Sequence, residues 1–129
     1  MDSDVRPSPR RYAVLIVDDE IDITSTFSML FEVHGFSVRT ASNGIEALAA
    51  LAESLPDLIV SDCMMPLMDG LELCRRVRAD AAMADIPIIL MSGAPDRHDL
   101  TSVTYDAFLK KPFLFSRLLT AVRKLLPGA

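Results

Sequence analysis

Five short apolar segments recur along the chain and predict β-strands. They cover residues 12–17, 36–41, 57–61, 86–91 and 106–110. The first, third and fourth segments are almost continuously apolar, as expected of parallel strands that are covered on both faces of a sheet. The second segment alternates more between polar and apolar residues, and the fifth is weaker. Together they predict a five-stranded sheet.

Apolar residues at helical spacing separate these strands. They recur three or four positions apart, which is typical of helices that pack one face against a sheet. The four sets are Ile23, Phe27, Leu30 and Phe31; Leu48, Leu51 and Leu55; Leu73, Cys74 and Val77; and Leu118, Val122, Leu125 and Leu126. Asn43, three residues before Glu46, is a capping signal for the second helix, and Pro56 is its expected end. The alternation of strands and helices predicts an α/β fold with a parallel sheet.

The region between the fourth and fifth strands has the weakest helical pattern. After Ser92 and Gly93, only Leu100 and Val103 offer an apolar face. The β-branched residues between 101 and 104 lower the helix propensity further. We therefore expect a fourth helix of at most two turns, or irregular structure.

Length and composition favour one compact, cytoplasmic domain. The chain has 129 residues, half of them apolar, which is enough for a core without disulfides or a structural metal. Its net charge of -5 argues against direct nucleic-acid binding through bulk positive charge. No apolar stretch approaches the roughly 20 residues needed for membrane insertion. Cys63 and Cys74 have no metal-ligand spacing and are interpreted as apolar fillers in a reducing compartment. Residues 1–11 are expected to form a flexible N-terminal arm and residues 12–127 the domain, with no output domain.

Polar residues follow the apolar segments at the positions where ligands bind in open α/β sheets. Asp18 and Asp19 follow the first strand, Asp62 the third, Ser92 the fourth and Lys111 the fifth. Because ligands bind beyond the carboxyl ends of the strands in such folds, we expect these side chains to gather at one rim.

This set of side chains predicts phosphoryl-transfer chemistry. Three clustered carboxylates repel one another, each pair by about 4 kcal/mol at about 4 Å and an effective dielectric of about 20. A hard cation such as Mg²⁺, or Mn²⁺, would relieve the repulsion and leave positions open for phosphate oxygens. The lysine and the serine can bind the same oxygens, and a carboxylate can form an acyl phosphate. The prediction is a metal-dependent transfer of a phosphoryl group to an aspartate.

Four motifs resemble those of one signalling family. They are "VDDE" at 17–20, "DCMMPLMDG" at 62–70, "MSGA" at 91–94 and "KPF" at 111–113. With these motifs in order, each closing an apolar segment, the chain is similar to the receiver domains of two-component response regulators over roughly residues 12–126. The resemblance implies a flavodoxin-like, doubly wound sheet of five parallel strands in the order 2-1-3-4-5. It also implies a switch rather than a turnover enzyme.

The resemblance assigns roles to the acidic residues. Asp62 would be the phosphoacceptor and one ligand of the metal. Asp19 would bind Mg²⁺ directly, and Asp18 would act through a water molecule. The backbone carbonyl of Met64 would be a further ligand.

It also assigns roles at the ends of the last two strands. Lys111 would pair with the phosphoryl group, and the peptide bond from Lys111 to Pro112 would be cis. Ser92 and Phe108 would be switch residues. Phe108 has no hydroxyl, so a switch through this ring cannot end in a new tyrosine-type hydrogen bond.

The phosphodonor is expected to be another protein. His34 and His98 have no charge-relay or metal-ligand pattern. The resemblance implies a sensor histidine kinase or a histidine phosphotransfer protein as donor, and a downstream protein target that the sequence does not identify.

Plainer interpretations remain open for several of these residues. Asp18 and Asp19 could only cap the first helix, Ser92 could be a loop hydroxyl, and Phe108 could be a core residue.

Two other functions also remain open. One is a receiver fold that binds partners constitutively, which the short fourth helix favours. The other is a phosphatase or phosphotransferase with an aspartyl intermediate. That enzyme would need an acid beside the nucleophile, where Cys63 and Met64 stand.

Overall fold

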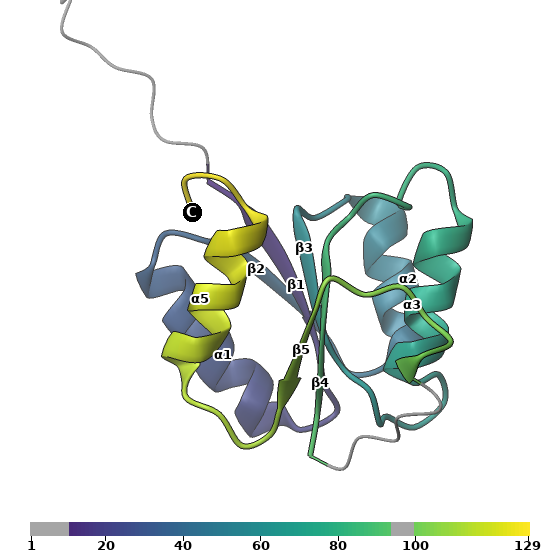
Figure 1. Cartoon of the computed structure of the whole chain (residues 1–129), viewed down its shortest axis with the longest axis horizontal. Coiled ribbons are helices and arrows are strands. Elements are labelled where there is room, and N and C mark those ends of the chain that lie inside the picture. Colours follow the sequence, from purple (N-terminus) through teal and green to yellow (C-terminus); the bar gives the residue numbers. More distant parts are fainter. Residues whose placement is uncertain (1–10, 94–99) are drawn as a thin grey trace, which may run out of the picture.

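The chain folds into one parallel sheet with helices on both faces. The computed structural model describes residues 11–93 and 100–129. All neighbouring strands are parallel, and their order is β2-β1-β3-β4-β5 (Figure 1). The strands are β1 (Ala13–Val17), β2 (Ser37–Ala41), β3 (Leu58–Asp62), β4 (Ile88–Ser92) and β5 (Ala107–Lys110). The predicted α/β class and strand order are confirmed.

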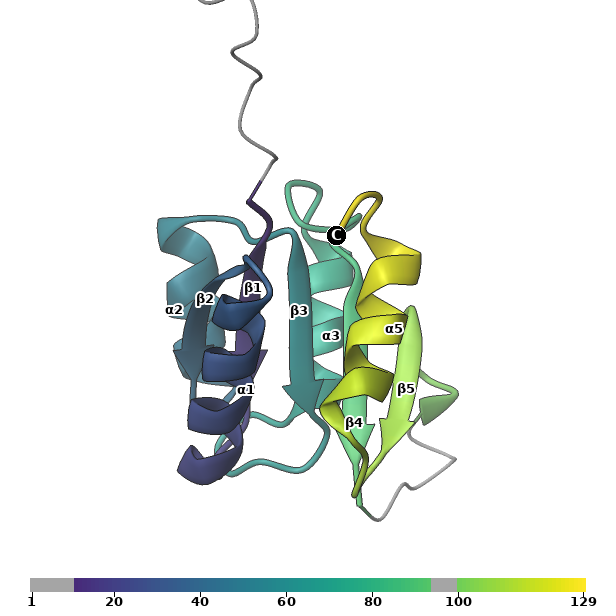
Figure 2. The same ribbon diagram turned by 90° about the vertical axis from the view of Figure 1, so that its left-hand side faces the viewer.

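The described helices cover the sheet in two pairs. α1 (Ile21–Val33) and α5 (Phe115–Leu125) lie on one face. α2 (Gly44–Glu53) and α3 (Gly70–Ala79) lie on the other, as Figures 1 and 2 show. Because the strands are parallel, their carboxyl ends meet at one rim of the molecule.

The continuous apolar pattern of β1 follows from this double cover. Val14 and Ile16 face the core beneath α1 and α5. Leu15 and Val17 face the core beneath α2 and α3. All four are essentially inaccessible to solvent. Close packing on both faces of the sheet therefore fixes the position of the carboxyl end of β1.

The predicted apolar face of α2 is wrong at Leu55. The Asn43 side chain accepts the expected hydrogen bond from the Glu46 N–H (2.9 Å), but the helix ends at Glu53. Leu55 lies beyond it and is 48% exposed, whereas Ala47 and Leu51 are buried. The physical reason is that a residue directly before proline disfavours helical backbone, so the helix stops earlier.

The predicted short fourth helix falls largely on residues 94–99, which lie outside the described residues. From Leu100 the chain makes a turn, in which the Val103 N–H donates to the Leu100 carbonyl (3.5 Å). Leu100 is itself helical, and residues 101–106 then lead into β5 without helix.

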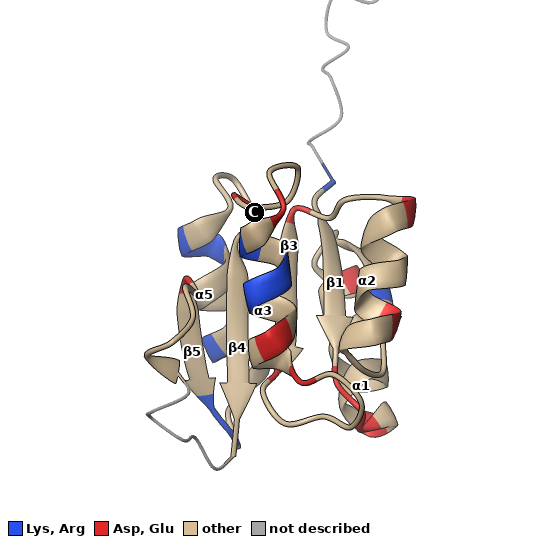
Figure 3. Cartoon of the chain, turned by 90° about the vertical axis from the view of Figure 1, so that its right-hand side faces the viewer, with Lys and Arg blue, Asp and Glu red and all other residues tan. Residues whose placement is uncertain are grey.

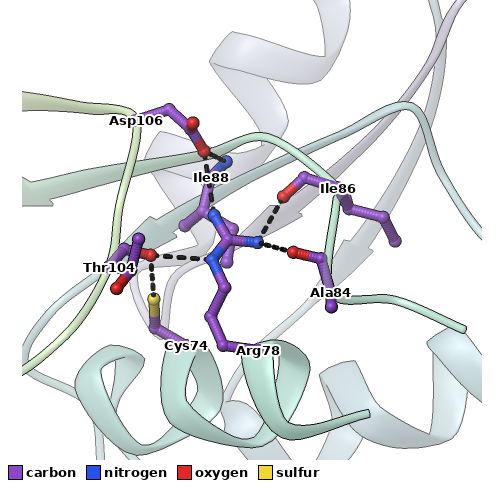
Figure 4. A network of polar contacts seen from close by, with 7 residues as sticks. All are labelled: Cys74, Arg78, Ala84, Ile86, Ile88, Thr104 and Asp106. Atoms are coloured by element: carbon purple, nitrogen blue, oxygen red, sulfur yellow. Dashed lines mark hydrogen bonds and ion pairs between the residues drawn. The ribbon is translucent and has the colours of Figure 1, made fainter. Parts of the chain in front are cut away.

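Arg78 of α3 holds the segment before β5 in place (Figure 4). Its guanidinium donates to the carbonyl oxygens of Thr104 (2.8 Å), Ala84 (3.0 Å) and Ile86 (2.7 Å). It also pairs with the Asp106 carboxylate at 2.9 Å. A single side chain thus ties together the end of α3, the approach to β4 and the approach to β5.

Replacing Arg78 with alanine should lower the free energy of unfolding by about 2–4 kcal/mol, because three carbonyls and a carboxylate each lose a hydrogen bond. Chemical denaturation measures this loss. Arg76 is the matched control, since its side chain is 54% exposed and Glu72 is its one ion-pair partner among the described residues. Arg76→Ala should cost less than about 1 kcal/mol. Equal losses in both variants would contradict the anchoring role.

Candidate functional site

Three carboxylates meet at the carboxyl ends of β1 and β3. The two strands are adjacent and in register from Val14 with Leu58 to Val17 with Ser61. Asp18 and Asp19 follow β1, and Asp62 ends β3. One oxygen of each carboxylate lies within 4.8 Å of the other two. Asp18 and Asp62 are buried and Asp19 is exposed, so the predicted acidic cluster is present with one open side.

Lys111 reaches the same cluster from the end of β5. Its Nζ lies 2.8 Å from Asp18 Oδ2 and 3.6 Å from Asp62 Oδ1. Its backbone N–H donates to the Ser92 carbonyl (2.9 Å), which fixes the chain beside β4. The peptide bond from Lys111 to Pro112 is cis, as expected. The structure therefore brings together the lysine and the acids that the sequence placed at separate strand ends.

Glu20 is a member of the site that the sequence reasoning missed. Its carboxylate Oε1 lies 3.8 Å from Lys111 Nζ and is largely exposed. Its backbone N–H donates to Asp18 Oδ1 (3.0 Å). The sequence did contain a signal for Glu20, because it is the third of three consecutive acids after β1 and so also lies at the rim. Glu20 is the N-cap of α1 without a side-chain cap, so Asp18 and Asp19 do not cap this helix by the usual bond.

The electrostatics of the cluster leave negative charge uncompensated. Burial raises the pKa of Asp62 to about 6. The charge of Lys111 and the hydrogen bond from the Met64 N–H lower this pKa, whereas the charges of Asp18 and Asp19 raise it further. Burial alone would lower the pKa of Lys111, but the hydrogen bond and charge of Asp18, with smaller contributions from Asp62 and Glu20, raise it above its ordinary value. Lys111 is therefore a permanent cation among the acids.

The fold and the site are those of a known signalling family. The model of the response regulator receiver domain matches residues 14–123. The chain belongs to this family. Receiver domains are signalling modules rather than turnover enzymes, and the two-component relatives below share this architecture.

Similar proteins include whole regulators and single receiver domains. Response regulator MprA from Mycobacterium sp. (strain KMS) is 35% identical over 116 residues, which are 88% of this chain and 50% of that protein. Chemotaxis response regulator CheY4 of Vibrio cholerae is 32% identical, with a TM-score of 0.84 over 91% of this chain and 100% of that one. The signal receiver domain of a histidine kinase from Syntrophus aciditrophicus is 33% identical, with a TM-score of 0.85 over 92% of both chains. The chain spans about half the length of the curated relatives it matches.

The acidic site of this receiver domain suits a divalent cation. The carboxylates of Asp18, Asp62 and Glu20 lie within 4.0 Å of one ammonium group. Asp18, Asp19 and Asp62 offer oxygens within 4.8 Å of one another. Mg²⁺ prefers a few hard oxygen ligands and retains waters, which the open side at Asp19 permits. The backbone carbonyl of Met64 lies in the loop directly after Asp62, and its role as a ligand stays a prediction.

Magnesium binding should weaken as the pH falls through the pKa of Asp62, because a carboxylate must be deprotonated to bind the metal. With that pKa at about 6, the affinity should drop about ten-fold from pH 8 to about pH 5. Isothermal titration calorimetry at several pH values measures this. The Asp62→Asn variant should bind weakly with a much flatter pH profile, and an unchanged wild-type affinity at low pH would contradict the account.

Gly70 allows the loop after β3 to pack against the strand end. Its N–H donates to the Cys63 carbonyl (3.1 Å). A Cβ at this position would lie 2.1 Å from the carbonyl oxygen of Asp62. Asp69 caps α3, because its side chain accepts a hydrogen bond from the Glu72 N–H (2.9 Å). The start of α3 is thus pressed directly onto the backbone of Asp62.

Replacing Gly70 with alanine should destabilise the domain by about 1–3 kcal/mol, because backbone atoms at the end of β3 must move. It should also weaken Mg²⁺ binding, since Asp62 shifts with that backbone. Thermal unfolding with and without Mg²⁺ measures both effects. Gly93→Ala is the control, because its Cβ would meet only Lys111 Cβ at 3.8 Å. Full stability and full Mg²⁺ binding in Gly70→Ala would refute this positioning role.

The two predicted switch residues lie on β4 and β5. Ser92 is buried at the end of β4, beside Lys110 in the strand register. Phe108 is half-buried, pairs with Leu90 in register and packs against the core beneath α2 and α3. Its ring forms an edge contact with Tyr105 at a centroid distance of 6.4 Å. These contacts establish a packing role for Phe108, and the switching role of both residues stays a prediction.

Proposed function

We propose that this receiver domain accepts a phosphoryl group on Asp62 from a histidine of a partner protein, in a Mg²⁺-dependent reaction. The observation that carries the proposal is the position of Asp62. Its carboxylate closes a buried strand, lies beside Asp18 and Asp19, and stands 3.6 Å from the Lys111 ammonium. A purely structural aspartate gains nothing from such acidic neighbours.

The chemistry follows from the chain's own side chains. A carboxylate oxygen of Asp62 attacks the phosphorus, and a new oxygen–phosphorus bond forms as the nitrogen–phosphorus bond to the donor histidine breaks. With a pKa of about 6, Asp62 is mostly ionised at neutral pH and available as nucleophile. The Lys111 ammonium balances charge on the phosphoryl oxygens, and the Ser92 hydroxyl can donate to them. A bound Mg²⁺ would further neutralise the carboxylates and the incoming phosphoryl group.

The donor is proposed to be a sensor histidine kinase or a histidine phosphotransfer protein. His34 follows the last residue of α1, and its Nδ1 lies 2.8 Å from the Leu30 carbonyl. Because α1 is 13 residues long, this ring lies about 20 Å along the helix from the acidic cluster. His98 lies outside the described residues. An external donor therefore explains the site better than His34 does.

The phosphorylated domain is proposed to act by changing which protein target it binds. A covalent phosphoryl group can shift binding only by favouring one of two conformations that already exist. Ser92 and Phe108 stand on the strands next to Lys111 and are proposed to respond first. A constitutive interaction module is the alternative, and its partner binding would not depend on Asp62.

The cytoplasm is the proposed compartment. Cys63 and Cys74 are free and buried. Burial raises the pKa of Cys63 to about 12 and that of Cys74 above its ordinary value, as expected of apolar fillers in a reducing environment. Among the residues that the structure describes, no helix is long and apolar enough to cross a membrane.

The proposal is tested by incubating the chain with acetyl phosphate and Mg²⁺ and measuring its intact mass. The expected result is a gain of one phosphoryl group that EDTA prevents. No gain under conditions in which the protein is folded and binds Mg²⁺ would overturn the proposed function.

A further inference from the structure

β2 is an outer strand of the sheet, and one of its two edges has no neighbouring strand. α1 lies on one face of this strand and α2 on the other (Figure 2). The Ser37 N–H and the Ala41 carbonyl form hydrogen bonds of 2.9 and 3.1 Å with residues at the two ends of β1. Because the hydrogen-bonding groups of successive strand residues point in opposite directions, those of Val38 and Thr40 point away from β1. Among the described residues, no hydrogen bond from outside the sheet reaches these outward groups.

The outer edge of β2 lacks the features by which proteins usually block a free strand edge. Such edges are commonly interrupted by proline, by a bulge or by an outward lysine. β2 contains no proline or lysine, and it pairs with β1 residue by residue without a bulge. Its one cation, Arg39, is turned onto α2, where it donates to the carbonyls of Ala50 (2.8 Å) and Ser54. The edge is therefore open to a further strand.

A groove of about 610 Å³ lies along this edge, between α1 and α2. We call it the β2 groove and define it by six of its lining residues, which are Ser28, Val38, Thr40, Glu46, Ala50 and Glu53. The Ser28 hydroxyl oxygen is buried, and it has no hydrogen-bond partner in the described part of the chain. A buried hydroxyl without a partner is costly, and one that lines a groove can gain its partner from an occupant.

The α2 wall of the β2 groove is acidic. α2 carries Glu46 and Glu53 and no lysine or arginine, and Figure 3 shows red near both of its ends. Neither carboxylate forms an ion pair within residues 11–93 and 100–129. The Arg39 guanidinium also lines the groove, but it is committed to carbonyl oxygens. The groove therefore favours basic side chains on its α2 side and a polar group beside Ser28 on its α1 side.

We propose that the β2 groove binds an extended, basic segment of another protein as a further strand of the sheet. Backbone groups of the segment pair with the outward N–H and carbonyl groups of Val38 and Thr40. Side chains of a strand point alternately to its two faces. Lysines or arginines at every second position therefore meet Glu46 and Glu53, and the residues between them face Ser28.

The spacing of the two carboxylates suits such a segment. Glu46 and Glu53 lie about 10 Å apart along α2, and alternate residues of a strand lie about 7 Å apart. The long, flexible side chain of lysine spans the difference. The β2 groove shares no residue with the cluster of Asp18, Asp19 and Asp62. The proposal thus goes beyond phosphoryl transfer and does not require it.

A second copy of the chain is the main competing occupant of this edge. Two β2 edges that pair antiparallel about a two-fold axis would bring α2 of one copy beside α2 of the other. Glu46 and Glu53 would then face the same two acids, and like charges disfavour such a dimer. A basic segment has the opposite charge, which favours its binding and speeds its association.

The test uses a short fluorescein-labelled peptide in which lysine alternates with threonine. Fluorescence anisotropy measures its binding to the full chain. One control peptide has glutamate in place of lysine, and another keeps lysine but carries N-methyl groups on its backbone amides, so that it cannot join a sheet. Only the first peptide should bind. No binding of the first peptide, or equally tight binding of its N-methylated form, would overturn the proposal.

Thr40→Pro tests the pairing of backbone groups. The change removes one outward N–H and places a ring at the edge, where a sheet tolerates proline. It should weaken peptide binding at least about ten-fold. Thr40→Val is the matched control, because valine keeps the N–H and the β-branched shape and should bind like the wild type. Equal affinities of the two folded variants would contradict strand addition, and a dimer of the chain that Thr40→Pro disrupts would assign the edge to a second copy instead.

A second pair of variants tests the charge without altering the backbone. Glu46→Gln with Glu53→Gln should weaken peptide binding about ten-fold, since two ion pairs are lost. Glutamine at position 46 keeps an oxygen that can accept from the Ser42 N–H. Asp80→Asn with Asp85→Asn is the control, because it removes the same charge from exposed positions between α3 and β4. Equal losses in both double variants would show attraction to bulk charge and overturn the proposal.

Discussion

The Asp62→Asn variant is expected to take up no phosphoryl group from acetyl phosphate, although it folds normally. The amide of asparagine is not a nucleophile that forms an acyl phosphate, and Asp18 is not free to replace Asp62. Asp18 is buried and held by Lys111 at 2.8 Å and by the Glu20 N–H. The rate of mass gain should fall by more than about a thousand-fold, as for the removal of an essential nucleophile.

Asp57→Asn is the matched control for this variant. Asp57 precedes the same strand, and its carboxylate accepts a hydrogen bond from the Ala13 N–H (2.8 Å) at the far end of the sheet. Its amide variant should be phosphorylated at nearly the wild-type rate. Retained phosphorylation in Asp62→Asn, or equal losses in both variants, would contradict the assignment.

Stability separates a chemical loss in Asp62→Asn from a folding defect. The folded domain raises the pKa of Asp62 to about 6, so it holds the proton more tightly than the unfolded chain does. Without metal, the wild type should therefore lose stability as the pH rises from about 4 to about 6. Asparagine carries no charge, so the variant should be more stable than the wild type at neutral pH, by about 1–3 kcal/mol. Urea denaturation in EDTA measures this difference, and a less stable variant would contradict the electrostatic account.

Asp62→Asn also decides between the switch and the constitutive module. If phosphorylation controls partner binding, a partner captured by the phosphorylated wild type should bind the variant poorly. Identical binding by the two proteins would favour the constitutive alternative.

Replacing Lys111 with alanine is expected to slow phosphorylation by about a hundred- to a thousand-fold, the usual effect of removing one charged group that stabilises a transition state. The ammonium lies 2.8 Å from Asp18 and 3.6 Å from Asp62, so in the proposed reaction it stands close to the phosphoryl oxygens. The measurement is the rate of mass gain with saturating Mg²⁺ and acetyl phosphate. Mg²⁺ should still bind, because all the carboxylates remain.

Lys110→Ala is the control for Lys111→Ala. Lys110 is exposed and shares no ion pair with the acidic cluster among the described residues. Its loss should change the rate less than about two-fold, since it makes no contact with the site. Similar losses in the two variants would indicate a general effect of positive charge rather than a placed ammonium group.

The fold was predictable because its signals are local. Continuous apolar segments indicated strands covered on both faces, and the rule that ligands bind beyond the carboxyl ends of strands placed Asp18, Asp19 and Asp62 at one rim. The register of β1 with β3 agrees with this. The helices were predicted from their apolar spacing, and the cap at Asn43 from the residues of its own segment. Each of these predictions needed only residues close together in the sequence and the rule for where ligands bind in open α/β sheets.

The features that the sequence did not predict depend on long-range contacts. Glu20 joins the site only because Lys111 arrives from 91 residues away. Arg78 looks like any charged residue of a helix until the paths of the chain before β4 and β5 bring four partners to it. Gly70 reads as a turn residue, and only the packed structure shows that a Cβ would strike Asp62. Leu55 was placed on a helix that the following proline ends early.

The most direct test of the central claim is to locate the phosphoryl group. The phosphorylated chain is reduced with borohydride, which converts an aspartyl phosphate to homoserine, and its peptides are sequenced by mass spectrometry. The account predicts homoserine at position 62 alone. Homoserine at 18 or 19, a phosphate ester on Ser92, or an unmodified Asp62 in a chain that has gained the mass of a phosphoryl group would contradict it.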